Sequence, residues 1–265
     1  SKWKIDPNIN DGYPSLRFNE ALPSIASLFN DPSSNGESSS PYIINSKDQF
    51  DNIASVYNYD PATYKSKHFR LNPNLTIDYQ GKALWSIGNS DHPFSGSIDG
   101  GNNTILNTLI SQSGDNSGLV GTSSGAIIKN ITLHISKAGN PDRADSQAGS
   151  RIGGIVGHAL NSTQLENVHV IGDGTDTLLT GYQLIGGIVG RNTSTINEAT
   201  IIKKCSVNKL KIQSTLSDAY GYSYVGGIAG SGAVKISECG VGSDVHIIGK
   251  RYVGGVLGFL SADIL

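Results

Sequence analysis

A short glycine-containing block recurs five times in the second half of the chain. The copies are SGLVG at 117–121, IGGIVG at 152–157, IGGIVG at 185–190, VGGIAG at 225–230 and VGGVLG at 253–258. The glycines that precede the apolar pairs are separated by 36, 33, 40 and 28 residues. Self-similarity at such a spacing indicates a repeat architecture, in which each copy belongs to one supersecondary unit.

A second segment recurs between these blocks. It reads IKNITL at 128–133, LENVHV at 165–170, IKKCSV at 202–207 and ISECGV at 236–241. The central apolar positions, 131, 168, 205 and 239, are 37, 37 and 34 residues apart. The last three residues of each segment alternate as in a half-buried strand. The first two apolar positions are three residues apart, which predicts a bend or bulge between them.

A β-solenoid explains both repeats. One coil cannot bury its own apolar face, whereas stacked coils form continuous apolar ladders. Glycine suits such coils because it accepts a positive φ at a corner and allows backbones to approach closely. A flexible glycine-rich linker is the alternative, but linkers lack ordered β-branched pairs after each glycine. The sequence therefore predicts an all-β fold, a parallel β-helix.

The first part of the chain is organised differently. Residues 30–41 are polar and of low complexity, which predicts a linker or exposed loop. We interpret 1–29 as the closing segment of a preceding module or an N-terminal extension, and 42–265 as the solenoid module. Ser46 and Gln49 have the spacing of a capping box. Apolar residues follow at helical spacing, which predicts one short capping helix near residues 47–57.

Short strands are expected after this helix, at 69–71 and 75–77, and they lead to WSIG at 85–88. Residues 94–105 predict a strand, a glycine–asparagine turn and another strand. The fifth glycine block is followed by no alternating segment before Leu265, and the chain contains no methionine. We therefore expect a piece of a longer protein, with the module truncated at its C-terminal end.

Composition and motifs exclude several functions. Lys and Arg number 20 against 22 Asp and Glu, without a basic stripe, so no nucleic-acid partner is expected. Apolar runs are too short for membrane insertion. An HExxH motif is absent, and the carboxylates form no pair at matched coil positions. His134 and His169 fall on or beside the strands, where outward or satisfied side chains are expected. The sequence thus predicts no enzyme and no catalytic or cofactor-binding residues.

Two features leave chemical alternatives open. Cys205 and Cys239 occupy the ladder position that Ile131 and Val168 fill elsewhere, which favours buried thiols over a disulfide. Neither cysteine has further ligands at zinc spacing. Residues 172–176, GDGTD, offer carboxylates for calcium but lack the full EF-hand spacing, so turn chemistry is favoured and no metal is predicted.

The order of unlike segments also resembles a known group of proteins. WSIG at 85–88, FSGSIDGGNNTI at 94–105, SGLVG, and then repeated GGIVG and IxxCxV segments are similar to bacterial surface proteins with GLUG-motif repeats. Similar segments occur in filamentous-haemagglutinin-like adhesins and in the stalk of IgA-protease-type metallopeptidases. The resemblance covers roughly residues 42–265, and residues 3–18 resemble the segment that closes such a module. It implies an extracellular β-helix-like repeat module, at the cell surface or secreted.

These observations predict a repeat module of an adhesin-like protein that acts in adhesion or as a projecting stalk. Expected partners are a surface protein or glycan of a host or neighbouring cell, and further modules of the same chain. The loops at 140–150 and 214–223 are candidate binding loops. Tyr220, Tyr222 and Tyr224 are candidate contacts, with at least one ring expected in the core. The alternatives are a polysaccharide-degrading enzyme on a β-helix and the non-catalytic stalk of a secreted protease.

Overall fold

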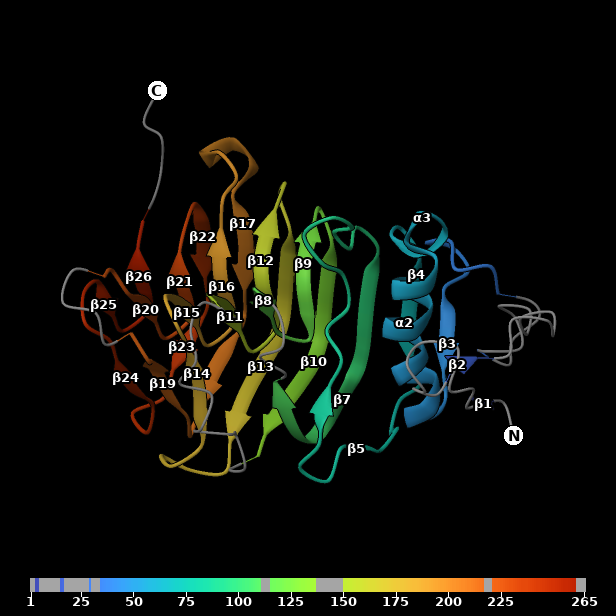
Figure 1. Ribbon diagram of the computed structural model, residues 1–265, viewed down its shortest axis with the longest axis horizontal. Coiled ribbons are helices and arrows are strands. Elements are labelled where there is room, and N and C mark those ends of the chain that lie inside the picture. The colour runs from blue at the N-terminus through green and yellow to red at the C-terminus, as the bar shows by residue number, and fades with distance from the viewer. Residues whose placement is uncertain are drawn as a thin grey trace.

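The computed structural model describes residues 34–110, 115–136, 150–216 and 221–260, together with 3–4, 15–16 and 29. This part of the chain is mostly β, and its sheets are built from parallel strands. The strands follow one another along the long axis of the molecule (Figure 1). The antiparallel pair β1 (Trp3–Lys4) and β2 (Ser15–Leu16) stands apart from these sheets.

Four parallel sheets carry the repeats. The largest has 11 strands, with the main order β22 (Val234–Ser237), β17 (Thr200–Lys203), β13 (Gln164–Gly172), β10 (Ile127–Ile135), β7 (Ser97–Ile110), β4 (His68–Leu71) and β3 (Tyr42–Ile44). Its remaining strands are β5 (Ile77–Asp78), β6 (Ala83–Leu84), β18 (Ser206–Asn208) and β23 (Gly240–Val241).

The glycine blocks form two further sheets. The first has the order β25 (Val253–Gly254), β20 (Tyr224–Gly226), β15 (Leu184–Gly186), β11 (Arg151–Gly153) and β8 (Asn116–Ser117). The second has the order β26 (Leu257–Phe259), β21 (Ala229–Ser231), β16 (Val189–Asn192), β12 (Val156–Leu160) and β9 (Val120–Ser124). A three-stranded sheet joins β14 (Leu178–Gly181), β19 (Lys211–Ser214) and β24 (His246–Ile248).

Pairing between strands follows the sequence repeat. Ile131 pairs with Val168 in the largest sheet. In the glycine-block sheet, Ile185 pairs with Val225, which in turn pairs with Val253. Except for Val253, these side chains are buried, so equivalent residues of successive repeats stack on one another in the core. The predicted apolar ladders are confirmed.

The predicted bulge is also present. Asn130, Asn167, Lys204 and Glu238 have φ angles of 54°, 53°, 54° and 54°. The register between β10 and β7 shifts between Lys129 and Ile131, where the left-handed residue lies. Asn130 donates a hydrogen bond to Asp99 (3.1 Å), and Asn167 donates one to Asn130 (3.0 Å). Asparagine tolerates this backbone region better than most residues, so the first two repeats use the residue that fits it.

Lys204 occupies this left-handed position without that advantage. We expect Lys204→Asn to raise the free energy of unfolding by about 0.5–1 kcal/mol, because asparagine relieves part of the left-handed strain. The ion pair lost with Glu166 is exposed and spans 4.0 Å, so it contributes little. Urea denaturation measures the change. Lys203→Asn, one residue earlier on β17, is the control and should not stabilise; equal stability of the wild type and Lys204→Asn would contradict the expectation.

Residues 94–105 differ from the expectation. Instead of two strands joined by a turn, β7 runs through Ser97–Ile110 as one strand. Gly101 and Asn102 have positive φ angles of 59° and 62°. Ile98 and Asn103 pair in parallel with Ile128 and Ile131, on either side of this irregularity. The glycine–asparagine pair therefore forms a bulge that matches the one in β10, because the chain must stay in step with its parallel neighbour.

Close approach of backbones explains the repeated double glycines. A Cβ on Gly154 would lie 2.6 Å from the carbonyl oxygen of Gly187, and one on Gly187 would lie 2.2 Å from that of Gly227. Neither position has a positive φ angle. Of the two reasons for glycine considered from the sequence, close approach applies and left-handed geometry does not.

Helix α2 (Lys47–Tyr59) confirms the predicted helix and extends it by two residues. Ser46 accepts a hydrogen bond from the Gln49 N–H (3.2 Å), while the Gln49 side chain accepts one from the N–H of Asn45 (2.5 Å). Phe50, Ile53 and Tyr57 of α2 are buried. The helix lies beside β3 and β4, at the end of the strand stack opposite β25 and β26 (Figure 1). The short helix α3 (Pro61–Tyr64) and the 3-10 turn η2 (Ile196–Glu198) complete the helical elements of the described residues.

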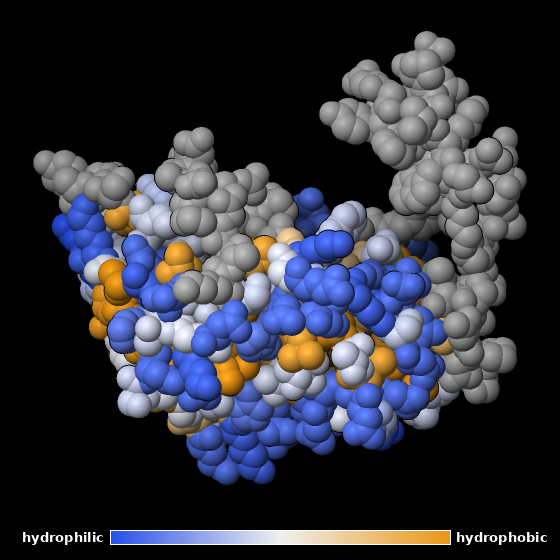
Figure 2. All heavy atoms as spheres, turned by 90° about the horizontal axis from the view of Figure 1, so that it is seen from below, coloured by the Kyte–Doolittle hydropathy of each residue, from blue (hydrophilic) through white to orange (hydrophobic). Residues whose placement is uncertain are grey.

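The opposite end of the stack is less covered. Its exposed apolar side chains are Ile248, Tyr252, Val253, Val256, Phe259 and Leu260. Figure 2 shows apolar residues between hydrophilic ones at this end of the molecule. Within the described residues, no strand pairs beyond β22, β24, β25 and β26. The same apolar ladders that are buried in the middle of the stack therefore reach the surface here.

Both cysteines are free thiols. Cys205 is buried, and the N–H of Cys205 donates to the sulfur of Cys239 (3.3 Å). Burial raises the pKa of Cys205 to about 12, so this thiol is protonated at neutral pH. Cys205 thus packs as a small apolar residue.

The helices of the described ranges include none with the length and apolar character needed to cross a membrane.

Candidate functional site

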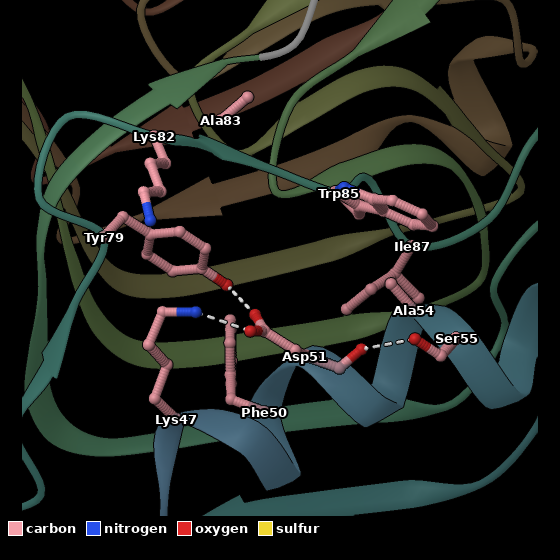
Figure 3. A pocket seen from close by; sticks show the side chains of 10 residues that line it. All are labelled: Lys47, Phe50, Asp51, Ala54, Ser55, Tyr79, Lys82, Ala83, Trp85 and Ile87. Atoms are coloured by element: carbon pink, nitrogen blue, oxygen red, sulfur yellow. Dashed lines mark hydrogen bonds and ion pairs between the residues drawn. The ribbon is translucent and has the colours of Figure 1, made fainter. Parts of the chain in front are cut away.

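A pocket opens between α2 and the segment that contains β5 and β6 (Figure 3). Its volume is about 280 Å³. Helix α2 contributes Lys47, Phe50, Asp51, Ala54 and Ser55, and the facing segment contributes Tyr79, Lys82, Ala83, Trp85 and Ile87. We call it the Trp85 pocket.

One side of the pocket is polar and internally paired. Asp51 accepts hydrogen bonds from the Lys47 ammonium (2.5 Å) and from the Tyr79 hydroxyl. The Lys47 Nζ lies 4.2 Å from the centre of the Tyr79 ring. Burial and the negative charge of Asp51 raise the pKa of Tyr79, so its hydroxyl stays protonated as a donor. This group of three holds the two walls of the pocket together.

The other side of the pocket presents an exposed indole. Trp85 is 70% exposed although tryptophan is normally among the more buried residues. Its ring lies near Ile87 and Ala54, across the pocket from Lys82 and Tyr79 (Figure 3). The Lys82 ammonium makes no ion pair within the described residues and is exposed. A flat apolar ring beside hydrogen-bonding groups and an unpaired cation is suited to a small polar ligand with an apolar face, such as a sugar.

A second cluster lies on β20 and β26 and on the residues just before β20 and β25. Its rings are Tyr222, Tyr224, Tyr252 and Phe259, which we call the aromatic ladder. Tyr224 and Tyr252 stack with centroids 5.0 Å apart and planes at 7°, and Tyr222 and Tyr252 stack at 5.9 Å. Phe259 lies 5.2 Å from both Tyr224 and Tyr252. The Arg251 guanidinium lies 4.7 Å from the Tyr222 ring centre.

The structure places two of the three candidate tyrosines. Tyr222 is 45% exposed and Tyr224 is half-buried, so neither belongs to the core. Tyr220 lies outside the described residues. The rings stack on one another at the surface, because residues just before equivalent glycine blocks become neighbours when the repeats align.

The two candidate binding loops are only partly described. The loop at 214–223 is described up to 216 and from 221, and the loop at 140–150 lies outside the described residues except for Ser150.

Other candidate polar residues make structural contacts. His134 Nε2 lies 2.8 Å from a carboxylate oxygen of Asp173, which belongs to the candidate calcium segment. His169 contacts Ser206 (2.9 Å) and Asn167 (3.1 Å). The described residues hold no group of three or more potential metal ligands. The Trp85 pocket was missed from the sequence, because WSIG gives no sign that its tryptophan is exposed.

Comparisons with known proteins place these features in context. No family model matches the chain. Halomucin of Haloquadratum walsbyi is 27% identical over an alignment of 187 residues, and the match covers 66% of this chain and 2% of that protein. A solved structure of a "putative immunoglobulin A1 protease" from Bacteroides ovatus superimposes with a TM-score of 0.65 at 23% identity, covering 89% of this chain and 66% of that one. This chain thus shares a fold with that structure and corresponds to a small part of the halomucin length.

Proposed function

We propose that the chain is a non-catalytic β-solenoid module of a secreted or cell-surface protein, of the kind that carries GLUG-motif repeats, and that it binds glycans through the Trp85 pocket. The stacked parallel registers support the solenoid, because each repeat buries its apolar residues against the equivalent residues of its neighbours. Similarity to halomucin and to the protease structure supports an extracellular location.

The exposed indole of Trp85 carries the glycan proposal. An apolar ring at the surface costs free energy in water unless a ligand or partner covers it. The C–H face of a sugar can cover the indole, while its hydroxyl groups bind the Lys82 ammonium and the polar side of the pocket. Hydrolysis of a glycosidic bond usually needs two carboxylates. Asp51 is the one acidic residue among the described residues that line the pocket, and it is paired with Lys47 and Tyr79.

Binding of the whole chain to a glycan array tests this function. Trp85→Ala should weaken binding of the selected glycan about tenfold, because a stacked ring contributes about 1.4 kcal/mol. Trp85→Phe keeps an aromatic face and should retain most of the affinity. Ile201→Ala, which alters an exposed apolar residue on β17, is the matched surface control.

The outcomes separate the alternatives. Binding that depends on Trp85 supports adhesion. A complete lack of binding to glycans and surface proteins would instead favour a passive stalk, such as that of a secreted protease. Release of reducing ends from a bound polysaccharide would overturn the non-catalytic proposal in favour of a polysaccharide-degrading enzyme.

A further inference from the structure

Arg151 and Arg191 lie on adjacent repeats, on strands other than those of the Trp85 pocket, where a Cβ on Gly190 of β16 would lie only 2.6 Å from the backbone N of Ile152 of β11. Arg151 begins β11, and Arg191 lies in β16, where it pairs in register with His158 of β12. Burial and the positive charges of Arg151 and Arg191 lower the pKa of His158 to about 4. His158 is therefore neutral at physiological pH, and the charge of this cluster comes from the two guanidinium groups.

The two guanidinium groups lack a carboxylate partner among the described residues. Arg151 donates from Nη1 to the neutral side chain of Asn116 (3.1 Å), and its buried Nε has no hydrogen-bond partner. Asp115 meets Arg151 only through the main chain in this bond, since the backbone N–H of Arg151 donates to the backbone carbonyl of Asp115 (2.9 Å). Both arginine side chains are half-buried. Like charges in such a setting are unfavourable, and an anion that accepts their free N–H groups would remove the penalty.

The aromatic ladder continues this surface. Arg151 and Tyr224 both pair with Leu184 of β15, one from each side, and Tyr224 stacks on Tyr252. Tyr252 stacks on Tyr222, which carries the Arg251 guanidinium over its ring. Cations therefore flank a row of partly exposed rings that runs across successive repeats. Sugar rings can stack on such a row, while guanidinium groups bind carboxylates or sulfates in bidentate fashion.

We propose that Arg151, Arg191 and the aromatic ladder form a binding surface for an acidic polysaccharide that lies along the stacked repeats. The spacing of charged groups and rings over several repeats suits a polymer better than a single sugar. Single-stranded nucleic acid also combines anions with stacking rings, but such binding uses a basic groove, whereas the chain has a net charge of −2. The surface is independent of the glycan-binding role of the Trp85 pocket.

The test measures binding of the full chain to immobilised heparin, polygalacturonate, neutral dextran and a single-stranded DNA oligonucleotide at physiological salt. Heparin and polygalacturonate distinguish sulfate from carboxylate as the recognised group. The double variant Arg151→Gln/Arg191→Gln should weaken binding of the preferred acidic polysaccharide at least about tenfold. Arg70→Gln/Lys235→Gln removes the same charge from exposed positions on β4 and β22 and should change affinity less than about twofold.

Further variants keep the test decisive. Tyr252→Leu should weaken polysaccharide binding by removing the central ring, and Ile201→Ala, at an exposed apolar residue on β17, should leave it unchanged. Arg191→Lys keeps the charge and should give intermediate affinity, which provides a readout if the double variant does not fold. The proposal would be overturned if the double variant and its charge control lost the same affinity, or if neither acidic polymer bound. It would also be overturned if dextran bound as tightly as the acidic polymers, or if the oligonucleotide bound more tightly than they do.

Discussion

Replacing Gly187 by alanine is expected to lower the free energy of unfolding by about 3 kcal/mol, the largest effect that we predict for a single substitution. The added Cβ would lie 2.2 Å from the carbonyl oxygen of Gly227 and 2.6 Å from Cγ2 of Val207. Backbone atoms of the next repeat cannot move aside without shifting a paired strand. The strain therefore spreads through the stack instead of being relieved by a side-chain rotation.

Gly240→Ala is the matched control for this substitution. Gly240 also lies at a strand, in β23, but a Cβ there meets no atom within 4 Å. We expect its stability to stay within about 0.5 kcal/mol of the wild type. Urea denaturation of both variants measures the difference, and the m value shows whether unfolding stays cooperative. Similar stabilities of the two alanine variants would contradict the close-approach explanation of the repeated glycines.

Val225→Ala is expected to lower the free energy of unfolding by about 2 kcal/mol, because it removes two buried methyl groups from the middle of an apolar ladder. Val225 is 0% exposed, and its register partner Val253 is 45% exposed. Val253→Ala makes the same chemical change one repeat later, where we expect a cost below about 0.5 kcal/mol.

This pair isolates burial from residue type and strand position. Thermal and urea unfolding of both variants give the two costs. Equal costs would mean that Val253 is covered in solution, for instance by a second copy of the chain, and analytical ultracentrifugation of the wild type would then reveal self-association. A larger cost at Val253 than at Val225 would contradict the observed order of the strands.

Much of the fold was predictable because repeats constrain one another. Residues at matching positions, such as Ile131 and Val168, must stack when successive repeats pair in register, so the sequence period predicts the pairing. The helix after Ser46 was predictable from its capping residues, which act locally. The glycine–asparagine pair at 101–102 was misread as a turn, because a local signal for a turn also suits a bulge inside a long strand.

The candidate sites were less predictable because they depend on contacts between residues that are far apart in the sequence. Tryptophan is common in strands, so its residue type does not predict exposure. Only the tertiary structure shows that the Trp85 ring lies exposed beside α2. Arg151 and Arg191 are far apart in sequence and carry no motif. They become neighbours because the backbones of β11 and β16 approach closely, so that a Cβ on Gly190 would lie 2.6 Å from the backbone N of Ile152.

The sequence alone determined the parallel repeat, its apolar ladders, the bulge within each repeat and the helix near one end. These features follow from side-chain alternation, from the special backbone preferences of glycine and asparagine, and from local capping. The tertiary structure alone decided which polar and aromatic side chains meet at the surface. Surface residues are not constrained by burial. Only the arrangement of the helix and the stacked repeats in space therefore places Trp85 at a pocket and brings two arginines into one cluster.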